Sequence, residues 1–302
     1  MNGVLVIYKP AGLTSHDVVN RARRIFQQRS VGHLGTLDPS ATGVLPLVIG
    51  NLTRLAQFYT SAEKVYEGVI RFGFATDTYD AAGEPTGPLQ NVKVSLEQVR
   101  ELGARFQGVI EQMPPPFSAK KINGVPAYRL ARKHQEVPLK PVQVEIREFE
   151  ILDVEGDHAS FRARVASGTY MRSVAHEMGQ QLGCGAHLSS LRRTMLAEFD
   201  LADAHTLEEA DTAASAGLLD EILIHPRKLL PQFPSVTANE ETASHIRNGR
   251  AVNLPELSRA RQVKVFSGQR ELIAIATRVA GTLFHPKIVL AAEPAKQLAR
   301  NT

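Results

Sequence analysis

The chain has 302 residues, of which 43% are hydrophobic and 22% charged, proportions that are typical of a soluble globular protein and argue against extensive disorder. No apolar run in it reaches the ~20 residues that a membrane-spanning helix needs, and its length is sufficient for one large domain and a small one. The single cysteine, Cys184, excludes an internal disulfide and a multi-cysteine metal site, so we expect a protein of the reducing cytoplasm.

The net charge is only +4, so the distribution of charge is more informative than its total. Between positions 120 and 140 the basic residues outnumber Glu136, the only acid there: Lys120, Lys121, Arg129, Arg132, Lys133 and Lys140. Further arginines cluster near positions 21–29 and 162–193, whereas positions 200–225 hold acids and no Lys or Arg. This asymmetry favours a face that binds a polyanion, although solvated helix surfaces would give the same pattern.

The first hundred residues predict alternating short strands and helices. Residues 4–7 form an apolar strand instead of a signal peptide, because no basic segment precedes them. Thr14 or Ser15 can cap a helix with apolar residues at 18, 19, 22, 25 and 26. A glycine-rich loop at 32–39, a strand at 43–49, an alternating strand at 65–74 and a helix at 96–106 follow.

The remainder of the chain predicts a second group of strands and a small β module. A proline run at 113–117 opens the basic segment, in which a short helix is expected around 127–133. Strands at 142–151 and 159–165 and a helix at 170–182 come next, followed by an acidic helical stretch. Residues 231–234 suggest a linker to strands at 263–266, 272–276 and 287–290.

Asp38 stands out because it lies between Leu37 and Pro39 in the glycine-rich loop. The proline disfavours helical geometry at Asp38, so the carboxylate projects from an extended segment, and the glycines allow a substrate to approach the backbone. An aspartate before a proline also commonly starts a simple turn. The local sequence therefore leaves both a catalytic and a purely structural role open.

Motifs spread along the chain restrict these alternatives. The segment GHLGTLDPSATGVL at 32–45 resembles the central motif of the TruB-type tRNA pseudouridine-55 synthases. Further segments of the chain resemble other motifs of this family, in the order in which the family has them. They lie at 9–15, 64–68, 115–121, 167–173 and 183–188, and the last leads into Leu191-Arg192-Arg193-Thr194. Ordered matches over residues 3–194 make coincidence an unsatisfactory explanation.

The resemblance implies a fold and a domain organisation. The fold class is α+β, a pseudouridine-synthase core whose mixed, mostly antiparallel sheet surrounds a central cleft. This core is expected over residues 1–230, with a basic RNA-gripping insertion at about 112–141. A PUA-like RNA-binding β module is expected at 235–292, and a flexible tail at 293–302.

The resemblance also implies the chemistry, which is isomerisation of a uridine without a metal or other cofactor. The N-glycosidic bond breaks, the base rotates, and a C–C bond forms through C5. Asp38 is then the essential carboxylate, and attack on C6, attack on the sugar and elimination–addition all remain open for it. A buried ionised carboxylate needs a cation beside it, and Arg172 of the 167–173 motif is the expected partner.

The same resemblance assigns residues that receive the flipped base. Tyr66 matches a tyrosine that stacks on the base and can assist proton removal from C5, although its strand position alone favours core packing. Tyr170 and Leu191 match positions that line the uracil pocket. His33 corresponds to a residue that wedges into the RNA loop where the base was. Lys9 is expected to brace the site, and Lys120 and Lys121 are expected to contact phosphates.

The implied substrate is the T-arm stem-loop of tRNA, which a monomer would bind without an obligate protein partner or a membrane. Two other functions are compatible with parts of the sequence. Cys184 could serve as a thiolate that adds to C6 of uracil during base methylation, although no methyl-donor motif is visible. The chain could also be an RNA-binding or chaperone module without enzymatic activity.

Overall fold

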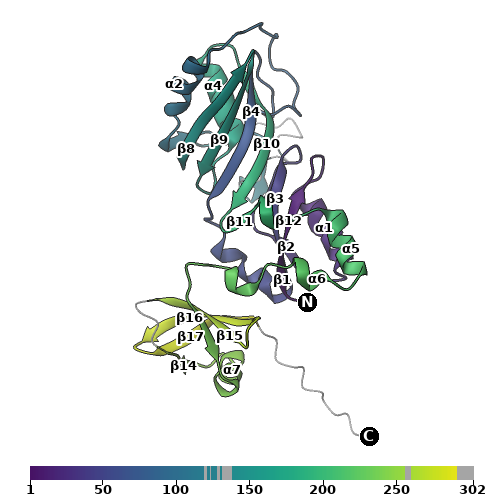
Figure 1. Cartoon of the computed structure of the whole chain (residues 1–302). Helices are drawn as coiled ribbons and strands as arrows, with labels where there is room; N and C mark the ends of the chain where they lie inside the picture. Colours follow the sequence, from purple (N-terminus) through teal and green to yellow (C-terminus); the bar gives the residue numbers. More distant parts are fainter. Residues whose placement is uncertain (119–120, 123, 128–129, 131–137, 256–259, 291–302) are drawn as a thin grey trace.

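The computed structural model describes residues 1–118, 121–122, 124–127, 130, 138–255 and 260–290. Figure 1 shows three parts that follow one another along the long axis of the molecule, with the carboxy-terminal module at one end. Lys120, the side chain of Lys121, most of the helix expected at 127–133 and the tail expected at 293–302 lie outside the described residues.

One large sheet runs through the first two parts. Its strands, in spatial order, are β12 (Ala204–His205), β1 (Gly3–Lys9), β3 (Thr42–Ile49), β10 (Ala186–Leu196), β4 (Lys64–Phe72), β9 (His158–Val165), β8 (Val142–Glu155) and β5 (Gly108–Gln112). Two short strands flank it, β2 (Val31–His33) beside β3 and β11 (Phe199–Asp200) beside β10. Only the β1–β12 and β3–β10 pairs are parallel in this sheet, which confirms the expected mixed, mostly antiparallel α+β fold.

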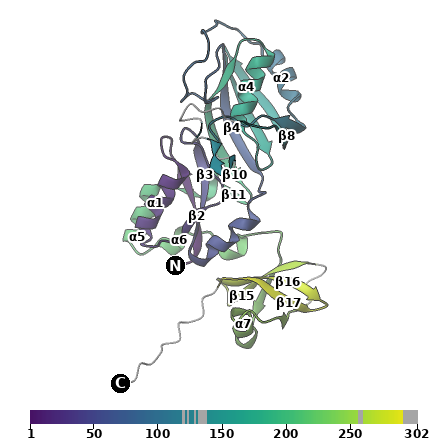
Figure 2. The same cartoon turned by 180° about the vertical axis from the view of Figure 1, so that it is seen from behind.

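Helices cover the sheet in two groups, one for each half. The described helices are α1 (Ser15–Ile25), α2 (Leu96–Ala104), α4 (Met171–Gln181), α5 (Leu207–Ser215), α6 (Leu219–Ile222) and α7 (Glu240–Arg247), with single-turn or 3₁₀ segments η1 (Gly50–Phe58), η2 (Leu201–Asp203) and η3 (Pro226–Lys228). Helices α2 and α4 lie on the same face of the second half of the sheet, which contains β4, β8, β9 and β10. Helices α1 and α5 lie side by side against the first half, which contains β1, β2, β3 and β12 (Figure 2). Thr14 caps α1 as the sequence predicts, by accepting a hydrogen bond from the Asp17 backbone.

The strand β10 was not predicted, although it joins the two halves of the sheet. Its pairing with β4 is irregular between Leu188 and Ser190 and again between Arg193 and Met195. Each irregularity shifts the side-chain alternation, so the sequence shows no continuous two-residue period. The same strand meets β3 at Gly43, whose φ is +100° and where a Cβ would lie 2.2 Å from the Arg193 carbonyl oxygen. Only glycine fits this crossing.

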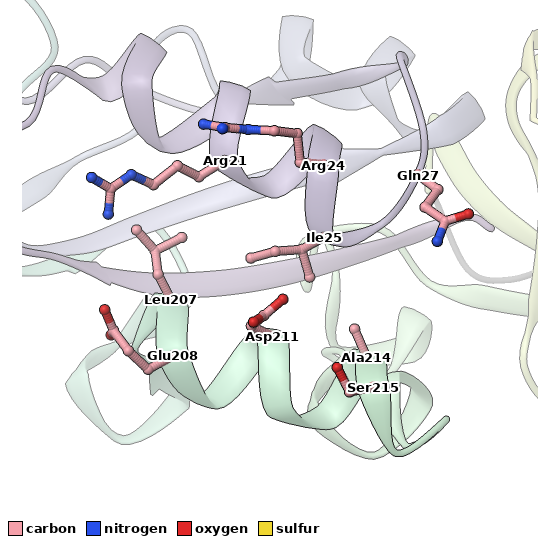
Figure 3. Close-up of a pocket in the computed structure, with 9 residues that line it drawn as sticks. All are labelled: Arg21, Arg24, Ile25, Gln27, Leu207, Glu208, Asp211, Ala214 and Ser215. Carbon is pink, nitrogen blue, oxygen red and sulfur yellow. The ribbon is translucent and has the colours of Figure 1, made fainter.

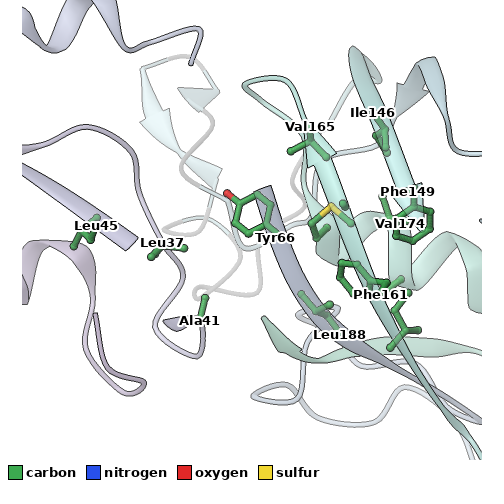
Figure 4. Packing of buried hydrophobic residues seen from close by; sticks show 14 of the residues in the cluster. Leu37, Ala41, Leu45, Tyr66, Ile146, Phe149, Phe161, Val165, Val174 and Leu188 are labelled. Carbon is green, nitrogen blue, oxygen red and sulfur yellow. The ribbon is translucent and has the colours of Figure 1, made fainter. Parts of the chain in front are cut away.

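A hydrophobic core extends across both halves of the large sheet. In Figure 4 the buried side chains run from Leu37 and Leu45 in the first half, past Tyr66, to Phe161 and Val174 in the second. Burial of this continuous cluster is the main stabilising contribution and holds the two halves together.

The carboxy-terminal module is a separate small sheet that packs against the first half. Its strands, in spatial order, are β13 (Ser235–Ala238), β15 (Gln262–Ser267), β16 (Glu271–Ala280), β17 (Leu283–Val289) and β14 (Val252–Asn253). A remaining short hairpin, β6 (Lys121–Ile122) and β7 (Val125–Pro126), lies in the basic segment. No helix among the described residues is long and apolar enough to cross a membrane.

A buried lysine reinforces the contact between the module and the preceding chain. Phe266 and Ile275 of the module share an apolar cluster with Val4 and Phe199 of the first half. Beside them Lys264 is only 2% exposed. Its Nζ donates to the main-chain oxygen of Arg227 at 2.8 Å and to that of Leu229 at 2.6 Å. The lysine therefore ties β15 to the segment that leads into the module.

Lys264→Met should lower the free energy of unfolding by about 2 kcal/mol, because the buried Leu229 carbonyl and the partly buried Arg227 carbonyl lose a charged donor. Urea denaturation measures the change. Lys287→Met, at an exposed position of the same module, is the matched control and should have almost no effect. Equal stability of the two variants would contradict a docking role for Lys264.

Candidate active site

A cavity of about 260 Å³ lies where the two halves of the large sheet meet. It is lined by residues from the β2–β3 connection, from β4, from β10 and from the start of α4: Thr36, Leu37, Asp38, Lys64, Tyr66, Gly168, Thr169, Tyr170, Met171, Arg172 and Leu191. Five of the residues expected at the site, Asp38, Tyr66, Tyr170, Arg172 and Leu191, are thus brought together here. The expected central cleft corresponds to this cavity.

Asp38 and Arg172 form a bidentate ion pair across the cavity wall. Arg172 Nε lies 2.8 Å from Asp38 Oδ2, and Arg172 Nη2 donates to Asp38 Oδ1 at 3.1 Å. The arginine side chain is 6% exposed, whereas the aspartate side chain is 34% exposed, so the carboxylate is the partner that faces the cavity. Two parallel N–H···O contacts fix the carboxylate plane as well as its position.

The remaining hydrogen-bonding capacity of Arg172 is used to hold it in place. Its Nη1 donates to the Thr78 carbonyl oxygen and its Nη2 to that of Phe117, each at 3.1 Å. Its Nε lies 3.9 Å from Oδ2 of Asp80, a buried carboxylate. Asp80 Oδ1 in turn accepts from the Thr78 hydroxyl at 2.7 Å and from the Ala82 backbone at 3.0 Å. Arg172 therefore lies between two aspartates, of which only Asp38 reaches the cavity.

Burial raises the pKa of Asp38 above its usual range, Arg172 opposes this shift, and the negative charge of Asp80 adds to it. The ionised form of Asp38 consequently depends on the guanidinium beside it. A carboxylate with a raised pKa that faces a cavity is typical of a reactive group, whereas a surface aspartate would show neither property.

Three buried side chains position the loop that carries Asp38. Ser15 Oγ donates to the Leu37 carbonyl oxygen at 3.1 Å and accepts from the Leu37 amide at 2.8 Å. Lys9, which is fully buried, donates through Nζ to the carbonyl oxygens of Pro10 at 2.8 Å and Pro39 at 3.2 Å. Burial lowers the pKa of Lys9 to about 8, although nearby Asp38 partly offsets the effect. Lys9 thus lies beneath the loop, consistent with a bracing role.

The third support, Arg193, enters from β10 on the opposite side of the loop. It is fully buried and donates to the carbonyl oxygens of Gly35 at 3.0 Å, Thr36 at 3.2 Å and Val44 at 2.8 Å. Burial lowers the pKa of Arg193, and its interactions with the nearby Tyr66 side chain partly compensate. These bonds fix the loop against β10, so the position of Asp38 is determined from both halves of the sheet.

Two tyrosines form aromatic walls of the cavity. Tyr66 is 8% exposed and belongs both to the core cluster and to the cavity lining, so core packing and contact with a ligand are compatible. The backbone of Tyr170 is fixed by Gln112, which accepts from its amide at 2.8 Å and donates to its carbonyl oxygen at 3.1 Å. Burial raises the pKa of Tyr170, so its hydroxyl stays protonated.

The structure does not bring every expected residue to the cavity. His33 is half-buried on β2 and does not line it. Burial lowers the pKa of His33, and its Nδ1 is buried without a hydrogen-bond partner among the described residues. Lys120 and the side chain of Lys121 lie outside the described residues, so their expected phosphate contacts remain predictions.

Two charged residues of the site were not predicted as functional, Lys64 in the cavity wall and Asp80 behind Arg172. Asp80 lies in the turn-rich segment after β4, where no periodicity indicates burial. The sequence does indicate Lys64, because it precedes Tyr66 by two positions on one strand. The two side chains therefore lie on the same face, toward the cavity.

A second hollow, of about 650 Å³, lies between α1 and α5, away from these residues. Figure 3 shows Arg21 and Arg24 of α1 on one side of it and Glu208 and Asp211 of α5 on the other. Part of the first arginine cluster thus lies opposite the acidic stretch. Arg21 and Arg24 thus form one side of a mixed-charge helix pair, and the expectation of a polyanion-binding face stays a prediction.

Comparisons with known proteins agree with this geometry. The family profile described as "TruB family pseudouridylate synthase (N terminal domain)" matches residues 23–171, and "tRNA pseudouridylate synthase B C-terminal domain" matches residues 172–226. A protein named tRNA pseudouridine synthase B from Solibacter usitatus (strain Ellin6076) is 50% identical over 96% of this chain and 100% of its own length. The chain belongs to the TruB family.

More distant relatives share the fold. The tRNA pseudouridine synthase B of Bacillus cereus (strain ATCC 10987 / NRS 248) is 39% identical over 100% of this chain and 98% of its own length. A chain from a Cbf5-Nop10-Gar1 complex superimposes with a TM-score of 0.70 at 25% identity, covering 96% of this chain and 85% of its own. This TruB-family chain is accordingly a pseudouridine synthase, an isomerase with a pseudouridine-synthase core.

Asp80→Asn should reduce the rate constant of pseudouridine formation by about 10–100-fold, because Arg172 loses a buried charge that orients it and Asp38 is displaced. The acid limb of the pH profile should move to lower pH, since removal of the Asp80 charge lowers the pKa of Asp38. Single-turnover assays over a range of pH measure both effects.

Asp77→Asn provides the control, because Asp77 lies on the same segment and does not contact Arg172. An unchanged acid limb in Asp80→Asn would contradict the electrostatic link between Asp80 and Asp38.

Proposed function

We propose that this chain is a tRNA pseudouridine-55 synthase, which isomerises the uridine of the T-arm loop of tRNA. The observation that supports this most directly is the ionised pair of Asp38 and Arg172, in which the carboxylate faces a cavity with aromatic walls. The names of the relatives add the substrate class, because both bacterial proteins are called tRNA pseudouridine synthase B.

The cavity suits a single base that has left its stack. Extrusion of a base costs a few kcal/mol, and stacking on an aromatic ring returns roughly 1–3 kcal/mol. Tyr66 supplies such a ring, while Tyr170 and Leu191 enclose the base from α4 and β10. Because Tyr66 is also packed in the core, its ring is held in place before the base arrives.

Asp38 is the group that carries the bond rearrangement. The bond from N1 to C1′ of the uridine breaks, the base turns, C5 bonds to C1′, and the proton on C5 is replaced by one on N1, so the product is an isomer. Attack on C6, attack on the sugar and removal of a sugar proton all require the ionised carboxylate. The bidentate contact with Arg172 maintains that form and directs the free face of the carboxylate into the cavity.

The structure argues against Cys184 as the nucleophile. Its side chain is buried and Sγ donates to the Gly185 carbonyl oxygen, and it does not line the cavity. A thiolate that attacks C6 must reach the base. Cys184 instead follows the tight turn at Gly183, where it packs in the core.

Asp38→Asn should decrease the single-turnover rate of pseudouridine formation in tRNA by about 10⁴-fold, while the Kd for tRNA changes little. Asparagine keeps the shape and a hydrogen-bonding oxygen and removes only the charge and basicity. Cys184→Ala, measured in parallel, should retain nearly full activity. Normal isomerisation by Asp38→Asn would refute the assignment, and a large loss in Cys184→Ala would revive the thiol mechanism.

The activity should fall on acidification at a higher pH than an ordinary aspartate would give. The active form is the carboxylate, its pKa is raised by burial, and lowering the pH through that value neutralises it. Arg172→Lys should move this acid limb to still higher pH, because an ammonium cannot reproduce the bidentate contact. The pH dependence of the single-turnover rate tests both statements, with Arg164→Lys, which changes an ion pair to Glu63, as the control.

A further inference from the structure

The cavity contains a lysine, Lys64, that has no part in the role proposed for Asp38. Lys64 is the first residue of β4 and lines the cavity together with Tyr66, two positions later on the same face of the strand. It is half-buried. The cavity is therefore bordered by an ammonium group as well as by the Arg172 guanidinium.

Lys64 has no anionic partner among the described residues. Its Nζ donates to the main-chain oxygen of Ala62 at 2.7 Å, which leaves further N–H donors. The two carboxylates that could compensate the charge are engaged elsewhere. Asp38 is held by Arg172, and the neighbouring Glu63 pairs with Arg147 at 2.7 Å and with Arg164 at 2.6 Å.

The surroundings of Lys64 make this lack of a partner costly. Burial and, to a smaller extent, the charge of Arg193 together lower its pKa to about 8. A partly desolvated ammonium without a counter-ion is destabilised, and an incoming anionic oxygen would relieve that cost. The uridine-containing RNA is a ligand that can supply one.

We propose that Lys64 contacts an anionic oxygen of the flipped nucleotide, either on its phosphate or on the uracil ring as the glycosidic bond breaks. The inference rests on the assignment of this cavity as the uridine site. When the bond from N1 to C1′ breaks, its electron pair remains on the base and spreads over O2 and O4. An ammonium group beside either oxygen stabilises this charge electrostatically without transferring a proton.

The test compares Lys64→Met and Lys64→Arg with the unaltered protein, using a tRNA T-arm stem-loop as the probe. Methionine keeps most of the apolar stem and removes the charge, whereas arginine keeps the charge. Lys93→Met, which removes the same charge from an exposed position outside the cavity, is the matched control. Urea denaturation verifies that each variant is folded.

Two results support the proposal and identify the oxygen. Contact with the uracil predicts that Lys64→Met loses about 10²-fold in single-turnover rate with an almost unchanged Kd. Contact with the phosphate predicts a weaker Kd and a slope of log K against log salt that is smaller by about 0.7. In both cases Lys64→Arg restores much of the loss. If Lys64→Met matches Lys93→Met in rate, Kd and salt slope, the proposal is wrong.

The pH profile gives a further readout. The advantage of the unaltered protein over Lys64→Met should be greatest below about pH 8 and decline above it, as the ammonium loses its proton. In Lys64→Arg the guanidinium stays charged, so the advantage of this variant over Lys64→Met should persist at higher pH. All variants keep the other titratable and charged groups around the cavity, so these groups contribute equally to each pH profile. They are Lys9, His33, Asp38, Glu63, Tyr66, Asp80, Tyr170, Arg172 and Arg193.

Asp38→Asn, assayed with the same stem-loop, separates this inference from the proposed function. Loss of activity in Asp38→Asn with an unaffected Lys64→Met would overturn only the role of Lys64. Retained activity in Asp38→Asn would instead overturn the assignment of the cavity itself.

Discussion

The ion pair between Asp38 and Arg172 is the contact on which the site depends. Asp38 comes from the loop of one half of the large sheet and Arg172 from the first turn of α4 in the other, so the pair forms only when both halves are folded and packed together. Burial raises the pKa of Asp38, and the guanidinium opposes that shift. The same contact therefore determines where the carboxylate lies and whether it is ionised, which links the fold of the domain directly to its chemistry.

Buried cations also position the loop, and they act on its backbone. Lys9 and Arg193 donate to main-chain carbonyl oxygens from opposite sides, and neither forms an ion pair with a carboxylate among the described residues. Carbonyl oxygens of an irregular loop have no partner strand, so they need donors of this kind when they are buried. Burial of the two cations carries a desolvation cost, and in return the loop is held in one conformation.

Much of the site could be predicted from the sequence, but only because several motifs occurred in one order. The local sequence around Asp38 favoured a simple turn over a catalytic residue, and the strand position of Tyr66 favoured core packing over stacking. The strand β10 was missed because its irregular pairing interrupts the alternation of side chains. Asp80 was missed because its burial depends on Arg172, which is distant in sequence, and no local pattern records that contact. Lys64 could have been found from its two-residue spacing to Tyr66.

If the cavity receives the uridine as proposed, the charge around it explains how Asp38 remains ionised when the base enters. Entry of a base displaces water, which increases the desolvation of the carboxylate and raises its pKa further. Asp38 and Asp80 are then opposed by Lys9, Lys64, Arg172 and Arg193, an excess of cations over carboxylates at the cavity and beneath its loop. Because attraction between charges strengthens as water leaves, the cations counteract the shift when it would be largest. The same excess attracts an anionic substrate, so in the proposed function substrate binding and the ionisation of Asp38 depend on one arrangement of charge.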